Sequence, residues 1–340
     1  MKPLLLSLAL AATLAPGAAQ RWDWGDVKDD YGMEASKALC RQVKGREPPA
    51  SDRPSAAEAA ALKGCDSEKL YYGIGMPADP VKARKCAFIE ADKGDEVVFG
   101  GRTMLMTIYA NGRGAERNLD VAIHLACGIE GAPAESDGRV LHLAGMRSKA
   151  ADDAFDYCDD ITSGLAMGYC EAHAATAEGA KRDAAWARLT AGWSPAEKQA
   201  LARVRTAHKA FAEAHSGGEL DLSGTARGAI AIAAEEKQAA ALLAMVRQLE
   251  ARRAPAFDHA RYLAADAALN AAYRKQLASV AGDRGPGAPT RQGIREAQRA
   301  WIAYRDAFLA FAAIRYPKVP RESLAAWLTQ ERTKMWESED

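Results

Sequence analysis

The 340-residue chain has no excess of either charge, since 45 lysines and arginines balance 45 aspartates and glutamates. A chain without net positive charge lacks the long-range attraction that draws proteins to nucleic acids and anionic membranes, so neither is expected as a partner. Aromatic residues make up only 7% of the sequence, β-branched residues are sparse, and alanine is abundant. This composition favours helices over sheets and predicts an all-α protein.

The sequence also lacks the common hydrolase motifs. It contains no Gly-x-Ser-x-Gly, Ser-x-x-Lys or His-Glu-x-x-His pattern and no Gly-rich phosphate loop ending in lysine. Two Cys/His pairs, His124 with Cys127 and Cys170 with His173, each supply only two of the four ligands that a structural zinc site needs. We therefore expect no enzymatic activity, no metal and no cofactor.

Long apolar runs are absent except at the start of the chain. Lys2 is followed by an apolar stretch from Leu4 to Leu14, a Pro16-Gly17 break, and small residues at the −3 and −1 positions of a cleavage site after Ala19. This pattern predicts a signal peptide over residues 1–19, too short to span a bilayer. No cysteine follows the site, so we expect a soluble periplasmic or secreted protein that begins near Gln20, without a membrane span.

Cysteine is absent from the second half of the chain. The six cysteines are Cys40, Cys65, Cys86, Cys127, Cys158 and Cys170. In an oxidising compartment an even set of this kind predicts disulfides, whereas residues 171–340 must be held together by packing alone. Charge divides the chain similarly, with 19 basic and 25 acidic residues in 20–170 but 15 and 10 in 251–340. Residues 20–170 are therefore acidic and residues 251–340 are basic, which indicates two regions.

Two stretches in the first region share a spacing. Tyr72-Gly73-Ile74-Gly75 precedes Asp79 and Cys86, and Ala110-Asn111-Gly112-Arg113-Gly114 precedes Asp120 and Cys127, with the glycine pairs 39 residues apart and the cysteines 41 apart. Each unit is predicted to be a helix, a glycine turn and a second helix, a pattern typical of solenoids.

The first four cysteines allow three pairings. We favour Cys86 with Cys127, because they occupy equivalent positions of adjacent repeats, and Cys40 with Cys65.

The stretch Leu105-Met106-Thr107-Ile108-Tyr109-Ala110-Asn111-Gly112-Arg113-Gly114, with Ala91-Asp92-Lys93-Gly94-Asp95 before it, resembles the Sel-one-like repeats, relatives of the tetratricopeptide repeat. The resemblance covers roughly residues 30–150, and we assign 20–151 to a helical repeat region. It implies a short disulfide-bonded α/α solenoid that presents a groove to a protein partner. The resemblance does not identify that partner.

The second half contains a duplication of its own. At a constant offset of 90, the apolar residues Val204, Ala207, Phe211 and Ala214 match Ile294, Ala297, Trp301 and Tyr304. In the second copy the stripe continues through Phe308 and Phe311, which predicts one buried face of a helix over about 293–316, stopped by Pro317. The pattern predicts two related helical hairpins, with Trp301 in the core.

The second copy carries the motifs Asp266-x-x-Leu269-Asn270-x-x-Tyr273 and Trp301-x-x-x-Arg305-Asp306. They resemble the N-terminal helical domain of LprI-type lysozyme inhibitors, with 152–255 as a first, degenerate copy and 256–340 as the second. Cys158 and Cys170 match the spacing of that family's leading cysteine pair, so the resemblance implies that they bond to each other. Leu309 stands where the family often places a cysteine, which removes one disulfide.

The resemblance implies a protein that binds and occludes a lysozyme-type peptidoglycan-cleaving enzyme. Candidate partner-binding residues are Arg305, Asp306, and, in the Gly-rich loop 282–293, Asp283 and Arg284; the loop 216–224 is a second protruding candidate. Alternatively, Arg305 and Asp306 pair with neighbouring helices, for instance through Asp266 and Asn270.

Other functions remain open from the sequence. The chain could be an immunity protein against a delivered toxin or a non-inhibitory envelope scaffold, and an enzyme is a third class for which no nucleophile is visible. Hen-type lysozymes are basic, so an acidic surface speeds their capture. We therefore expect the second half to supply the specific contacts and the repeat region to supply steering or a second partner.

Overall fold

The computed structural model describes residues 22–28, 31–94, 98–148, 154–280 and 285–337. Within these ranges there are thirteen α-helices, four 3-10 helices and no strand, which confirms the all-α prediction. None of the helices in this part of the chain is long and apolar enough to cross a lipid bilayer. The predicted signal peptide, residues 1–19, lies outside the described residues.

The first region is made of short helices. They are η1 (Trp24–Asp26), α1 (Glu34–Gln42), η2 (Ala50–Asp52), α2 (Ala56–Ala61), α3 (Ser67–Tyr72), α4 (Pro80–Lys93), α5 (Gly101–Asn111), α6 (Leu119–Cys127), α7 (Pro133–Gly145), η3 (Met146–Ser148) and η4 (Tyr157–Asp160). Glycine turns separate α3 from α4 and α5 from α6, as predicted. Gly112 has φ of 63°, and a Cβ there would lie 2.8 Å from Cβ of Arg117, so the turn requires glycine.

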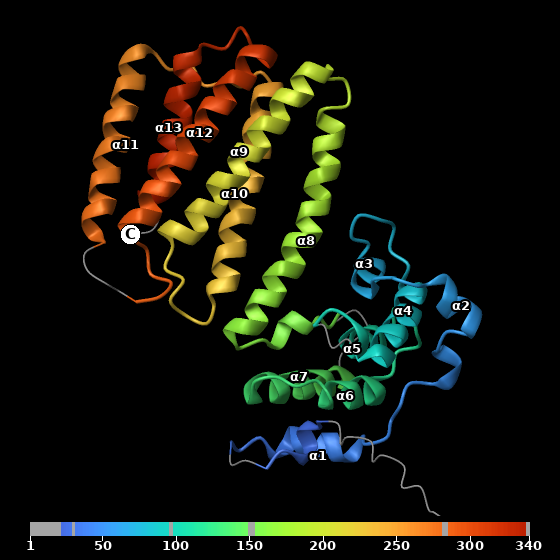
Figure 1. The fold of residues 1–340 in the computed structure, drawn as a ribbon. Coiled ribbons are helices and arrows are strands. Elements are labelled where there is room, and N and C mark those ends of the chain that lie inside the picture. Colours follow the sequence, from blue (N-terminus) through green and yellow to red (C-terminus); the bar gives the residue numbers. More distant parts are fainter. Residues whose placement is uncertain (1–21, 29–30, 95–97, 149–153, 281–284, 338–340) are drawn as a thin grey trace, which may run out of the picture.

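The second region contains six longer helices. They are α8 (Gly164–Leu189), α9 (Pro195–Glu219), α10 (Arg227–Glu250), α11 (His259–Ser279), α12 (Arg291–Arg315) and α13 (Arg321–Glu337). The predicted hairpins are each followed by a further helix, so the region consists of two units of three helices. The most extensive packing joins α9 to α12, α8 to α10 and α11 to α13, so the two units interlock through α9 and α12 (Figure 1).

Helices α9 and α12 approach each other closely where the end of one meets the start of the other. A Cβ on Gly218 would lie 2.8 Å from the carbonyl oxygen of Gly293, so only glycine fits there. At the opposite end of the pair, the Trp193 ring stacks on Phe311 with centroids 5.8 Å apart. The two helices are therefore antiparallel and in contact along their length.

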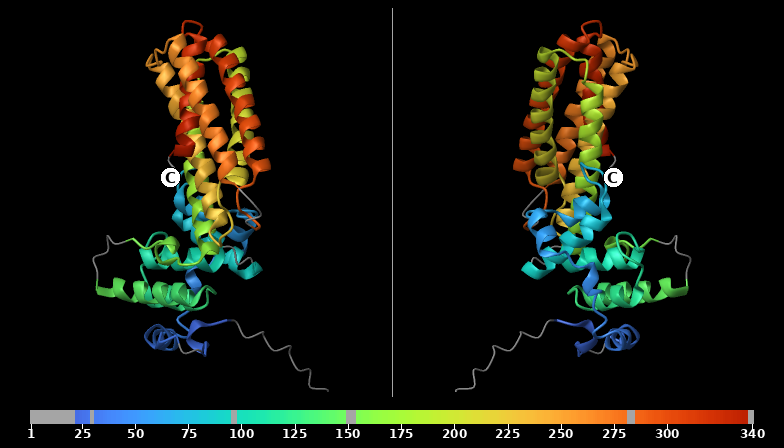
Figure 2. Two further views of the ribbon diagram at one scale, coloured as in Figure 1. Left: turned by 90° about the vertical axis from the view of Figure 1, so that its left-hand side faces the viewer. Right: turned by 90° about the vertical axis from the view of Figure 1, so that its right-hand side faces the viewer.

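The buried apolar residues form two cores. The first extends from Trp24 to Tyr157, and the second from Ala185 to Trp336. Helix α8 contributes to both, because Cys170 near its start packs against the first core while Trp186 near its end is part of the second. Figure 2 shows α8 rising from the short helices of the first region into the bundle above them.

The predicted stripe on α12 is buried. Ile294, Ala297, Trp301, Tyr304, Phe308 and Phe311 are each at most 4% exposed. Trp301 is 2% exposed and belongs to the second core, as predicted.

Three disulfides join all six cysteines, and they correct part of the sequence prediction. Cys158 bonds to Cys170 as predicted, but Cys40 bonds to Cys127 and Cys65 bonds to Cys86. The predicted Cys86–Cys127 and Cys40–Cys65 bonds are wrong. The reason is that α5 packs between α4 and α6, which separates the helices of Cys86 and Cys127, while α1 packs against α6 and α7 and brings Cys40 to Cys127.

The burial of Trp301 predicts a large loss of stability on truncation. Trp301→Ala should lower the free energy of unfolding by about 3–5 kcal/mol, because it empties a large position in a packed core. Urea denaturation checks this, with Ile302→Ala as the matched control, since Ile302 is 39% exposed on the same helix. Equal stabilities of the two variants would contradict the assignment of Trp301 to the core.

Candidate protein-binding site

Arg305 and Asp306 lie together on the outer side of α12. The Arg305 Nη2 and Nε atoms donate to Oδ1 of Asp306 at 2.8 and 3.0 Å, and the guanidinium lies 5.4 Å from the centroid of the Trp301 ring. On α11, Asn270 donates to Asp266 at 2.9 Å, whereas Arg305 and Asp306 pair with each other. The Asp306 side chain is 54% exposed and accessible to a partner.

The two candidate loops differ in how much of them the structure describes. Asp283 and Arg284 lie outside the described residues, so their role stays a prediction. The expected loop 216–224 is shorter than predicted, because residues up to Glu219 continue α9, and Ser216 is only 3% exposed where α9 meets α12. The backbone N–H of Leu222 donates to the carbonyl of Gly287 at 2.7 Å, which joins this loop to the one before α12.

The two Cys/His pairs are used structurally. Cys127 and Cys170 are in disulfides and so cannot act as thiolate ligands. His124 pairs with Glu47 at 3.1 Å, and His173 Nδ1 lies 2.5 Å from Glu68 Oε1. Among the described residues no three histidine, cysteine or carboxylate side chains are grouped so that they could hold a metal ion.

A buried ion pair connects the two three-helix units. Arg332 on α13 is 1% exposed and donates to both carboxylate oxygens of Glu219 on α9, with Nη1 to Oε2 at 2.9 Å. His215 Nδ1 lies 2.7 Å from the same Oε2 atom. Burial alone would raise the pKa of Glu219, but hydrogen bonds from His215 and Arg332 hold it below its ordinary value, so the carboxylate stays ionised.

Aromatic rings surround the Arg332 guanidinium. The Arg332 guanidinium lies 4.0 Å from the Trp336 ring centroid and 5.1 Å from that of Phe211. Its Nε donates to Oε1 of Gln298 at 3.2 Å. Sequence reasoning missed this pair because Glu219 and Arg332 are 113 residues apart. A signal was present, since Arg332 continues the i, i+4 series Leu324 and Leu328 on the buried face of α13.

A second ion-pair cluster closes the other end of α9 and α12. Arg315 donates to Glu197 at 2.9 Å and to both carboxylate oxygens of Glu250 at 3.0 Å, and Tyr316 donates to Glu250 at 2.8 Å. The hydrogen bond from Arg315 lowers the pKa of Glu197 to about 2. Arg315 joins α9, α10 and α12. Ion pairs therefore hold α9 and α12 together at both ends of the pair.

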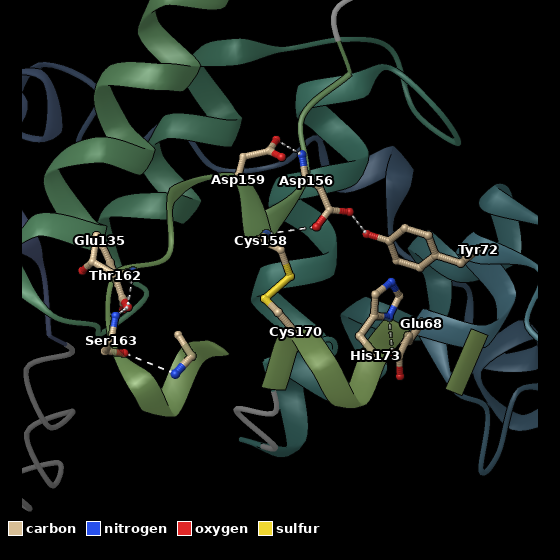
Figure 3. Close-up of a disulfide and its surroundings, with 11 residues drawn as sticks. Glu68, Tyr72, Glu135, Asp156, Cys158, Asp159, Thr162, Ser163, Cys170 and His173 are labelled. Carbon is tan, nitrogen blue, oxygen red and sulfur yellow. Dashed lines mark hydrogen bonds and ion pairs between the residues drawn. A yellow bond between two sulfur atoms is a disulfide. The ribbon is translucent and has the colours of Figure 1, made fainter. Parts of the chain in front are cut away.

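The start of α8 is fastened to the first core (Figure 3). The Glu135 carboxylate, on α7, accepts the backbone N–H groups of Thr162 and Ser163 at 3.0 and 2.6 Å. The Cys158–Cys170 disulfide links the preceding connector to α8, with the two Cα atoms 5.9 Å apart. This end of α8 therefore has a fixed position relative to the first core.

Two further contacts hold the same junction. Tyr72 donates its hydroxyl to Asp156 at 2.7 Å (Figure 3). The His173 ring stacks on Phe99 with centroids 4.2 Å apart. The Glu68–His173 pair lies beside them. The arrangement offers no nucleophile with a positioned base, but it provides a rigid scaffold with exposed charged groups, which suits protein binding.

Comparison with known proteins adds one family. The sequence model of the family Lysozyme inhibitor LprI matches residues 256–335, which contain α11, α12 and nearly all of α13. This match supports the resemblance drawn from Asp266, Asn270, Trp301, Arg305 and Asp306, all of which lie inside it. No curated protein and no solved structure matches the chain.

The buried ion pair makes Glu219 important for stability. Glu219→Gln should lower the free energy of unfolding by about 3–5 kcal/mol, because it leaves Arg332 buried without a counter-charge. Glu213→Gln, on the same helix but solvent-exposed, is the control and should change stability by less than about 1 kcal/mol. Thermal and urea denaturation measure both, and a Glu219→Gln protein as stable as this control would refute the coupling.

The carboxylate at the start of α8 predicts an acid-sensitive contribution. Burial acts to raise the pKa of Glu135, but the N–H donors of Ser163 and Thr162 hold it below its ordinary value. Its contribution is therefore complete at neutral pH and is lost as the pH falls below about 4.3 through the lowered pKa. Unfolding measured from pH 6 to 2 should show a shallower acid decline for Glu135→Gln than for wild type or Glu130→Gln. Parallel curves for all three would contradict this role.

Proposed function

We propose that this chain is an exported protein-binding protein that inhibits a lysozyme-type peptidoglycan-cleaving enzyme by covering its active cleft. The observation that carries the proposal is the match of residues 256–335 to the lysozyme inhibitor LprI family. The predicted signal peptide supports location in the periplasm or outside the cell, where such enzymes act. The proposal requires no chemistry from the chain, since occlusion is steric.

The geometry of the bundle supports inhibition by occlusion. A steric inhibitor gains affinity when its contact groups are held in place before binding. Arg305 is held by Asp306 and by the Trp301 ring, and Trp301 is itself fixed in the core. We assign the specific contacts with the enzyme to this outer side of α12, where Asp306 offers an exposed carboxylate to a basic partner.

The remaining helices have supporting roles in this proposal. The α3–α4 and α5–α6 pairs with their glycine turns support the assignment of residues 20–151 to Sel-one-like repeats, and the order of α8, α9 and α10 supports 152–255 as a degenerate copy of the following unit. The acidic excess of residues 20–170 would speed the approach of a basic enzyme. An immunity protein against a delivered muramidase toxin would use the same surfaces.

A second candidate function is a non-inhibitory envelope adaptor. It is favoured by the extent of the family match, which covers 256–335 and leaves the first core and α8–α10 outside it. In that case the first region would bind one protein and the bundle another. Inhibition of a lysozyme separates the two functions, since an adaptor leaves its partner active.

The proposal predicts inhibition that depends on Asp306. The mature chain should slow the clearing of bacterial cell-wall suspensions by hen-type lysozyme, and Asp306→Lys should weaken inhibition about tenfold by removing a complementary charge. Glu296→Lys carries the same charge change on an exposed residue of α12 ten positions earlier and should inhibit like wild type. Melting temperatures provide the folding control. Absence of inhibition by the wild-type chain would favour the adaptor instead.

A further inference from the structure

A groove runs along the start of α8 where it meets the first core. Two cavities of about 550 and 380 Å³ adjoin there, and Val98, Gly100 and Tyr169 line both of them. One wall is the first half of α8, and the other includes the start of α5 and the segment 128–132. We call this the junction groove.

The α8 wall of the junction groove is apolar and open to solvent. Leu165 is 70% exposed and Tyr169, one turn later, is 46% exposed. Ala172 and Thr176 continue the same helix face along the groove. Adjacent exposed apolar side chains in a groove mark a binding surface, because a partner's apolar side chain would remove them from water at about 25 cal/mol per Å².

Most charged side chains that line the junction groove are acidic, although Asp66 pairs with Lys69 at 2.8 Å and Glu68 pairs with His173. The carboxylates that line it are Asp66, Glu68, Glu90, Glu130 and Glu135, whereas Arg102 is the one lysine or arginine among the described lining residues. Glu130 is exposed at the edge of the groove. A groove with low-dielectric walls focuses this negative potential, so it attracts cations and repels anionic lipids and nucleic acids.

The walls of the groove are fixed before any partner arrives. Glu90 accepts the backbone N–H groups of Ser67 and Gly101, at 3.0 and 2.9 Å, which sets the start of α5. Glu135 and the Cys158–Cys170 disulfide hold the start of α8 opposite it (Figure 3). Because the groove is preformed, binding of a partner costs little conformational entropy.

We propose that the junction groove binds a cationic amphipathic segment of a protein partner, with lysine or arginine residues flanking one or two leucine-sized side chains. The apolar side chains pack on Leu165 and Tyr169, and the cations lie near Glu130 and the carboxylates at the far end of the groove. This site is separate from Arg305 and Asp306 on α12. The test of this site uses no lysozyme, so its outcome does not depend on whether the chain inhibits lysozyme.

The experiment measures fluorescence anisotropy of labelled ten-residue peptides titrated with the mature full-length chain. A peptide alternating lysine and leucine should bind, and its affinity should fall as salt rises. Matched peptides alternating glutamate with leucine, or lysine with serine, should bind at least about tenfold more weakly. Equal affinity for the lysine–leucine and glutamate–leucine peptides, or no binding of the lysine–leucine peptide, would overturn the proposal.

Surface variants locate the binding. Leu165→Ser combined with Tyr169→Ser should weaken binding of the lysine–leucine peptide at least about tenfold with an unchanged melting temperature, since both residues are exposed. Met167→Ser is the matched control, because Met167 is 40% exposed on the same helix but lines neither cavity. Equal effects of the double variant and the control would overturn the proposal. A dimer of the wild-type chain in sedimentation that the Leu165→Ser, Tyr169→Ser variant converts to a monomer would also overturn it, because a second copy would then cover the groove.

Discussion

Helix α8 belongs to two hydrophobic cores, and the arrangement of the molecule follows from that constraint. Its start is fixed to the first core by the Cys158–Cys170 disulfide and by the Glu135 carboxylate, and its end places Trp186 in the second core. A helix of 26 residues is about 39 Å long. The short helices and the bundle are therefore held at a set separation by a rigid element, and the junction groove lies where that element begins.

The second core is closed by charges at both ends of the α9–α12 pair. Glu219 and Arg332 form a fully buried pair at one end, and Arg315 with Glu197 and Glu250 forms a half-buried cluster at the other. Both clusters join residues of 256–335 to residues before it. The segment that matches the LprI family thus packs along α9 through α12, with Glu219 of α9 neutralising Arg332 and Glu250 of α10 pairing with Arg315.

Sequence reasoning predicted the features that depend on local chemistry. The glycine turns, the buried stripe of α12 and the core position of Trp301 follow from backbone conformation or periodicity, and the Cys158–Cys170 bond follows from the resemblance to the LprI-type inhibitors. The other two disulfides and the Glu219–Arg332 pair depend on which helices become neighbours, and the pattern along the chain does not encode this. Arg305 and Asp306 were predicted as partner-binding candidates, but their pairing with each other required the structure. The apolar face of Leu165 and Tyr169 was missed because α8 was expected to pack as half of a hairpin.

The central claim is that the bundle, and α11–α13 in particular, binds a muramidase. Hydrogen–deuterium exchange of the mature chain, with and without hen-type lysozyme, tests this most directly because it reports contact without a substitution. We predict slower exchange on binding at amides of α12 and of the loops beside it. Protection confined to α1–α7, with α11–α13 unchanged, would contradict the account.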